Sequence, residues 1–184
     1  DIMEGEPFEC PMRPFGGADA FAWNPDSKSL VYVSRKLKGQ EYAFSTDSNL
    51  YLYELESGKT SLLTDGMPGY DTDPVFSPDG KTLAYAGALT DKKLNMHSGL
   101  YLYDLETGET KELFGPDRFN GLGSLAFVGD QLIFSAEEHG EDWMRFGGTN
   151  LYSIPLEGGE PVMAVPVAET EDFGGNPGSD CRYG

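Results

Sequence analysis

The side chains best suited to bind a ligand lie close together in residues 137–149. Glu137 and Glu138 are the only adjacent pair of glutamates in the chain, and Trp143 and Arg145 follow them. Paired carboxylates attract a cationic group, an indole ring offers a flat apolar surface, and a guanidinium donates paired hydrogen bonds to an acidic group. This pattern predicts a binding loop. The alternative is a solvated loop with its aromatic side chains packed beneath it.

Catalytic motifs are missing from the sequence. It contains no Gly-x-Ser-x-Gly nucleophile elbow and no phosphate-binding P-loop. Its two histidines, His97 and His139, have neither the partners of a catalytic triad nor the spacing of a zinc site. We therefore predict that this chain contributes no catalytic residue and holds no metal and no cofactor.

Two further patterns resemble ligand sites but stand in the wrong context. Residues 121–126 fit Gly-x-Gly-x-x-Ala, yet they lead into a strand, so no helix N-terminus follows to bind a phosphate. Asp71 and Asp73 have the spacing of a calcium loop, but Pro74 and the strand after it break the pattern. We predict a turn or strand-entry role for this segment.

An internal repeat defines the elements that must position the binding loop. A first motif recurs with its aspartate after 53 and then 51 residues, and a second recurs with its turn glycine every 50 residues. The first motif occupies residues 21–32, 74–85 and 125–134, and the second occupies residues 49–58, 99–108 and 150–158. Each repeat reads as four short strands, a to d, with no helical period between them.

The expected strands have recognisable ends. Strand a ends at Trp23, Phe76 or Phe127, and the Pro of each Asn/Ser-Pro-Asp turn has the fixed φ that the second turn position needs. The third copy has Gly129-Asp130 instead, which predicts a two-residue primed hairpin. In the first repeat, strands b, c and d are expected at 30–34, 50–55 and 61–64, and strand d recurs at 111–114 and 161–165. The longest connections, 35–48, 88–98 and 137–149, join strands b and c and should leave from one face.

Strand c of the first repeat is apolar on both sides, which indicates a sheet covered on both faces. We assign Leu50, Leu52 and Leu55 to one side and Tyr51 and Tyr53 to the other. Repeated four-stranded sheets stacked face to face are the blades of a β-propeller. The predicted fold is therefore all-β, a partial β-propeller of about three four-stranded antiparallel blades plus a remnant strand. A two-sheet sandwich is the alternative, but it does not predict such a repeat.

The repeat also suggests a division of the chain. Residues 1–9 match residues 104–112, which suggests the end of a strand c followed by a strand d. The expected segments are a strand d remnant of a preceding blade at 1–15, blades at 16–66, 67–116 and 117–168, and a linker or the start of a next blade at 169–184. Because propellers close with four to eight blades, we expect this chain to be part of a longer one.

Charge and cysteine content exclude only a few classes of binding partner. The chain has 31 acidic and 13 basic residues, a net charge of −18, which disfavours binding to nucleic acid and to anionic lipid. No apolar run is long enough to span a bilayer, and the first residues show no targeting signal. Cys10 and Cys181 form either a disulfide or two free thiols, because spacing alone does not decide.

Several stretches resemble known propellers. Residues 23–28 and 76–85 resemble the WD40-like, TolB-type propeller repeat. Residues 13–17, 42–48 and 69–80 resemble the N-terminal propeller of bacterial prolyl oligopeptidase-family serine peptidases, in the acylaminoacyl-peptidase and dipeptidyl peptidase V-like branch. The resemblance covers nearly the whole chain.

The resemblance implies a function for the chain as part of a larger peptidase. In that family the propeller caps a C-terminal α/β-hydrolase domain, which carries the Ser-Asp-His triad, and admits only small or unfolded peptides. Dipeptidyl peptidases of the family hold the substrate amine with glutamates from the propeller, which makes Glu137 and Glu138, with Trp143 and Arg145, candidate substrate contacts. The implied partners are that hydrolase domain and peptide substrates, and the implied location is periplasmic or secreted, with the cytoplasm left open.

Two other expectations follow from the same repeat. A TolB-like propeller that only binds protein partners is the alternative function, and a Gly-x-Ser-x-Gly elbow in a longer sequence would separate the two. The end blades should each present an apolar face, since blades stack face to face. We therefore expect the chain to self-associate through its end blades.

Overall fold

Three four-stranded antiparallel sheets make up the structure, a computed structural model that describes residues 2–11, 17–89, 91, 97–138 and 149–164. The first sheet contains β1 (Phe21–Trp23), β2 (Ser29–Ser34), β3 (Asn49–Glu54) and β4 (Thr60–Leu62). The second contains β5 (Tyr70–Phe76), β6 (Thr82–Ala88), β7 (Gly99–Asp104) and β8 (Thr110–Phe114). The third contains β9 (Phe119–Val128), β10 (Gln131–Glu138), β11 (Asn150–Pro155) and β12 (Val162–Met163).

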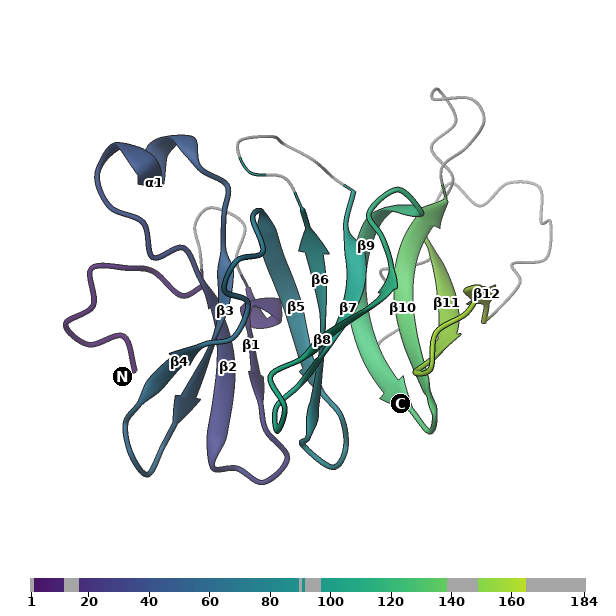
Figure 1. The fold of residues 1–184 in the computed structure, drawn as a ribbon, viewed down its shortest axis with the longest axis horizontal. Coiled ribbons are helices and arrows are strands. Elements are labelled where there is room, and N and C mark those ends of the chain that lie inside the picture. Colours follow the sequence, from purple (N-terminus) through teal and green to yellow (C-terminus); the bar gives the residue numbers. More distant parts are fainter. Residues whose placement is uncertain (1, 12–16, 90, 92–96, 139–148, 165–184) are drawn as a thin grey trace.

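The sheets stand side by side in chain order, each with the strand order of a propeller blade (Figure 1). The predicted all-β architecture of four-stranded antiparallel blades is therefore confirmed. The described residues contain two short helices: a 3₁₀ turn, η1 (Ala18–Ala20), precedes β1, and α1 (Gln40–Phe44) lies between β2 and β3. Within the described ranges, neither is long enough to cross a membrane.

Matching turns close the hairpin between the first two strands of each sheet. The Ser27 amide donates to the Asn24 carbonyl at 2.8 Å, and the Gly80 amide donates to the Ser77 carbonyl at the same distance. The third sheet uses the predicted two-residue turn, with Gly129 at a φ of 61°. The local turn chemistry read from the sequence is thus confirmed in all three copies.

An aromatic pair occupies the same cross-strand position in every sheet. The pairs are Tyr32 with Tyr51, Tyr85 with Tyr101, and Phe134 with Tyr152, with ring centroids 5.5, 5.5 and 5.7 Å apart. We call the side of a sheet that carries its pair the aromatic face, and the opposite side the aliphatic face. Such cross-strand contacts stabilise a sheet and fix its register.

The core lies between the sheets, where an aliphatic face meets an aromatic face. The aliphatic face of the first sheet, including Val31, Val33 and Leu50, packs on Tyr85 and Tyr101 of the second. The aliphatic face of the second sheet packs in the same way on the third, through Ala84, Ala86, Leu100 and Leu102. Two apolar faces per sheet, predicted from strand c, are therefore confirmed.

One side chain of strand c was assigned to the wrong face. Leu55 lines a hollow together with Tyr53 on the aromatic face, instead of lying beside Leu50 and Leu52. Side chains alternate along a strand, so residues 51, 53 and 55 share one side.

The N-terminal residues differ from the expectation of a remnant strand. Residues 2–11 contain no strand; they form a turn in which the Glu6 amide donates to the Met3 carbonyl at 3.0 Å. Side chains of this segment pack on the aromatic face of the first sheet: Ile2, Met3 and Cys10 contact the cluster of Leu30, Tyr32 and Tyr51. A strand forms backbone hydrogen bonds with a neighbouring strand at the edge of a sheet. This segment instead packs its side chains on the face of the first sheet, so it forms no strand. Residues 169–184 lie outside the described residues.

Candidate functional site

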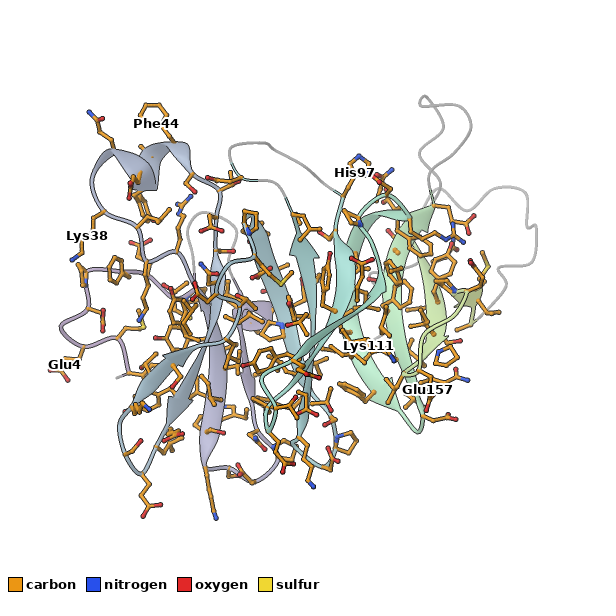
Figure 2. The ribbon with its side chains drawn as sticks, in the orientation of Figure 1. Glu4, Lys38, Phe44, His97, Lys111 and Glu157 are labelled. Atoms are coloured by element: carbon orange, nitrogen blue, oxygen red, sulfur yellow. The ribbon has the colours of Figure 1, made fainter. Side chains whose placement is uncertain are left out.

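The long connections leave from one edge of the array. Strands β2, β6 and β10 all end there, and β3, β7 and β11 begin there (Figure 1). Figure 2 shows Phe44, at the end of α1, and His97, just before β7, on this side of the molecule. The shared edge, predicted from the repeat, is the edge from which connections of different length and sequence start. We call it the loop edge.

The predicted glutamate pair lies in a strand instead of a loop. Glu137 and Glu138 are the last two residues of β10 and stand opposite Asn120 and Phe119 of β9. The prediction that the connection begins at residue 137 is wrong, because β9 extends far enough to pair with both glutamates and β10 therefore continues to Glu138. Neighbouring residues of a strand point to opposite faces, so the two carboxylates diverge.

Each glutamate has its own surroundings. The Glu137 carboxylate accepts a hydrogen bond from the Thr149 hydroxyl at 3.2 Å, which holds it against the start of β11. Glu138 is exposed and lies near Tyr152; burial raises the pKa of this tyrosine, and the negative charge of Glu138 raises it further. The other two candidate contacts, Trp143 and Arg145, lie outside the described residues.

A cation lies on the same edge of the array as Glu138. The guanidinium of Arg118 is 4.7 Å from the ring centroid of Phe119, which is the strand partner of Glu138. The positive charge of Arg118 partly offsets the rise in the pKa of Tyr152. Glu138 and Arg118 thus place opposite charges near the buried Tyr152, and these two exposed side chains form a charged cluster whose chemistry suits an amine or a carboxylate.

A second cluster on the loop edge was missed from the sequence. The Arg35 guanidinium lies 4.1 Å from the ring centroid of Tyr42 and donates a hydrogen bond to the Ser45 carbonyl at 3.0 Å. Next to it is a hollow of about 430 Å³, lined by Pro7, Phe8, Glu9, Leu37, Lys38, Gly39 and Tyr42. The signal was present: residues 35–38 hold three of the 13 basic residues of an acidic chain. The net charge of −18 describes the whole chain and does not reveal this local group of basic residues.

The paired aspartates belong to the sheet, as predicted. Asp71 lies within β5 and is buried, and its backbone amide donates to the Ser48 carbonyl and hydroxyl at 3.2 and 3.1 Å. Burial raises the pKa of Asp71 to about 7 and that of Asp73 to about 6. Within the described ranges, no group of three or more side chains is arranged to hold a metal ion.

Comparisons with curated proteins find relatives named dipeptidyl-peptidase 5. Over 91 residues, half of this chain, the sequence is 50% identical to dipeptidyl-peptidase 5 of Porphyromonas gingivalis, and the match spans 13% of that protein. Over 162 residues it is 29% identical to dipeptidyl-peptidase 5 of Aspergillus oryzae, which covers 83% of this chain and 21% of that one. The chain thus spans well under two thirds of the length of these relatives. No family model matches it.

Solved structures share the fold across different functions. TolB of Acinetobacter baumannii is 23% identical with a TM-score of 0.52, covering 81% of this chain and 33% of that one. Acylaminoacyl peptidase of Pyrococcus horikoshii is 18% identical with a TM-score of 0.51, covering 74% and 24%. Hydrazine synthase of Kuenenia stuttgartiensis is 14% identical with a TM-score of 0.59, covering 85% and 44%. At these identities the likeness shows the propeller fold alone.

The sequence relatives and the fold agree. The chain is similar in sequence to part of dipeptidyl-peptidase 5, and it has the fold of TolB-type and acylaminoacyl-peptidase propellers. The resemblance found in the residues is therefore confirmed.

Proposed function

We propose that this chain is a non-catalytic propeller segment of a serine exo- or oligopeptidase of the prolyl oligopeptidase family, which gates peptide access to a hydrolase domain elsewhere in the whole protein. The observation that carries this proposal is the 50% identity over 91 residues to dipeptidyl-peptidase 5. The fold alone does not choose among functions, since structures with unrelated chemistry share it. The chain supplies a scaffold, and the reaction belongs to residues outside it.

The loop edge supports a role in peptide access. It combines the cationic and aromatic surface at Arg35 and Tyr42 with the charged cluster around Glu138. Loops on one side of a rigid scaffold are the usual place for binding. A peptide has a positive and a negative end, and both kinds of complementary charge are present on this edge.

Loop shortening in the whole peptidase tests the gating role. Replacing residues 37–44 with two glycines removes α1 and should raise kcat/KM for a 20-residue peptide by more than it does for a dipeptide substrate. The matched control replaces residues 56–58, a turn on the opposite edge, with three other residues. Equal changes for long and short peptides would contradict gating, and a whole protein without peptidase activity would contradict the proposed function.

The amine contact is assigned to Glu138, because the two glutamates diverge and Glu137 is held by Thr149. In the whole peptidase, Glu138→Gln should raise KM for peptides with a free amine by roughly tenfold or more, the loss of one charge-assisted contact of about 1.5–3 kcal/mol. N-blocked peptides should respond little. Glu137→Gln is the matched control, and equal effects on free and blocked peptides would indicate a solvated carboxylate.

A TolB-like scaffold that only binds proteins is the second candidate, because TolB shares the fold over 81% of this chain and the fold alone does not choose between the two functions. The sequence of the whole protein separates the two candidates. A Gly-x-Ser-x-Gly elbow after the last blade supports the peptidase, because that motif positions the nucleophile of an α/β-hydrolase. Its absence would support the scaffold.

A further inference from the structure

The guanidinium of Arg35 is held in a fixed orientation at the loop edge. Arg35 directly follows β2, and its planar group lies 4.1 Å from the ring centroid of Tyr42, a residue of α1. Its Nη1 donates a hydrogen bond to the Ser45 carbonyl at 3.0 Å. Stacking on a ring and a hydrogen bond at one nitrogen together restrict how the planar group can turn. The remaining N–H groups are therefore presented in a defined direction.

The hydrogen-bonding capacity of Arg35 is only partly used. Its Nε–H is buried and has no hydrogen-bond partner among the described residues, although buried donors are normally paired. The bond that Nη1 makes goes to a neutral carbonyl, so that bond does not neutralise the positive charge. Nε and Nη2 lie on the same edge of a guanidinium, with the spacing of the two oxygens of a carboxylate. This edge of Arg35 therefore suits a carboxylate acceptor.

The local charge also favours an anion. Residues 35–38 include Arg35, Lys36 and Lys38, in a chain whose net charge is −18. Lys38 lines the hollow of about 430 Å³ together with Tyr42, so a second cation lies near the ring that supports Arg35. In an acidic protein, a local group of basic residues attracts anions that the rest of the surface repels.

The site lies where the first two sheets meet at the loop edge. Burial raises the pKa of Tyr70, the first residue of β5, and the positive charge of Arg35 partly offsets this rise. Arg35 is therefore close to the start of β5 as well as to the end of β2. Propeller blades stack through their faces, so further blades in a longer chain would leave this edge uncovered.

We propose that Arg35 binds a carboxylate of a peptide at the loop edge, with Tyr42 supporting the guanidinium and Lys38 adding a second positive charge. The identity of the ligand as a peptide rests on the proposed function, whereas the preference for a carboxylate rests on the geometry of Arg35. The C-terminus and an acidic side chain of a peptide share this chemistry. Glu138 is the candidate contact for the amine of a peptide, so the two sites take groups of opposite charge.

Calorimetry on the whole protein tests this site with peptides that resist hydrolysis. The probes are N-methylated tetraalanine as the free acid, the same peptide as the C-terminal amide, and that amide with one alanine replaced by aspartate. The free acid or the aspartate peptide should bind about tenfold more tightly than the plain amide, and the tighter of the two identifies the source of the carboxylate. Arg35→Gln should abolish this preference. Lys59→Gln is the matched control, because it removes one positive charge from an exposed turn on the opposite edge.

A second variant tests the support from the ring without changing the charge. Tyr42→Leu should reduce the preference for the carboxylate by about threefold, because the guanidinium loses the surface on which it stacks. Phe44→Leu is the control: Phe44 lies on the same helix and is 71% exposed, so its replacement should leave the preference unchanged. Circular dichroism melts establish that the variants remain folded.

The outcomes separate this site from the proposed function. Equal affinity for all three peptides, or a preference that survives Arg35→Gln, would overturn the carboxylate site. Peptide hydrolysis by the parent protein together with either result would leave the proposed function standing. A carboxylate preference that depends on Arg35, in a whole protein without peptidase activity, would support the site and contradict the proposed function.

Discussion

The two internal interfaces use the same framework but differ at one buried position of the innermost strand. Asp71 of β5 faces the first sheet, and the residue 51 positions later in the repeat, Leu122 of β9, faces the second sheet. Both strands bulge at the same place, with Asp73 and Ser124 at a φ of 52°. One repeat has thus placed a carboxyl group where the next has a leucine.

The side chains around these two positions differ in the same way: they are aromatic in one interface and partly polar in the other. The interface between the second and third sheets contains a connected aromatic cluster of Phe114, Phe119, Phe134 and Tyr152, with centroids 4.7–5.7 Å apart. The interface between the first and second sheets has polar links instead: Ser48 bonds the backbone of Asp71, and the Tyr85 hydroxyl lies 3.0 Å from the Met67 sulfur. We infer that packing dominates the stability of one interface and that protonation modulates the other.

Truncation of the aromatic cluster should have the largest effect. Phe134 is fully buried and contacts three other rings, so Phe134→Ala should lower the free energy of unfolding by about 3–5 kcal/mol. The loss should be nearly the same at pH 5 and pH 8, because the four rings carry no carboxyl group and the nearby Glu138 is exposed. Urea unfolding followed by circular dichroism measures it. Val128→Ala, at a 54% exposed position of β9, is the control; an equal loss there would contradict the assignment of the core.

Asp71 should make the other interface sensitive to pH. Its pKa is about 7 in the folded chain against 3.8 without burial, so folding takes up a proton between about pH 4 and pH 7. The free energy of unfolding should therefore fall as the pH rises through this window. Burial of Asp73, whose pKa rises to about 6, contributes in the same direction.

Asp71→Asn should remove most of this fall. We expect the variant to gain about 2–4 kcal/mol over the parent chain at pH 8 and to lose this advantage near pH 4, where Asp71 is protonated. Asp117→Asn, at an exposed position, is the matched control. A gain at pH 8 that persists at pH 4 would show that the benefit comes from something other than the buried charge.

A contact between the β1–β2 turn and the β5–β6 turn offers a smaller test. The Asn24 side-chain amide donates to the Gly80 carbonyl at 3.2 Å, and a Cβ on Gly80 would overlap the Asn24 side-chain oxygen. Gly80 also has a φ of 71°, so Gly80→Ala should cost about 1–2 kcal/mol. Gly129→Ala, at a φ of 61° with open space around it, should cost only the backbone strain. Equal losses would show that the contact with Asn24 adds nothing.

The sequence predicted the parts of this structure that depend on local chemistry. Turn residues such as Pro25 and Gly129 act within a few positions, so the strands and hairpins followed from the repeat. The burial of Asp71 depends on how two sheets pack, and an Asp-Thr-Asp pattern carries no sign of that. The position of Glu137 in a strand depends on how far β9 continues beside β10, which neither sequence alone determines. The cluster at Arg35 was overlooked because the charge was summed over the whole chain instead of being examined segment by segment.

The weakest expected effect concerns the polar contact between the second and third sheets. The Lys111 ammonium donates to the Leu156 carbonyl at 2.9 Å, and Lys111 is exposed (Figure 2). Water can replace an exposed hydrogen bond of this kind, so Lys111→Met should change the free energy of unfolding by about 0.5 kcal/mol or less. The same thermal and urea measurements apply, at low and high salt. Lys28→Met, in the exposed turn before β2, is the control, since both variants lose one positive charge from an acidic chain. A loss above about 1 kcal/mol at Lys111 alone would mean that polar contacts also hold this interface, and the contrast between the two interfaces would have to be abandoned.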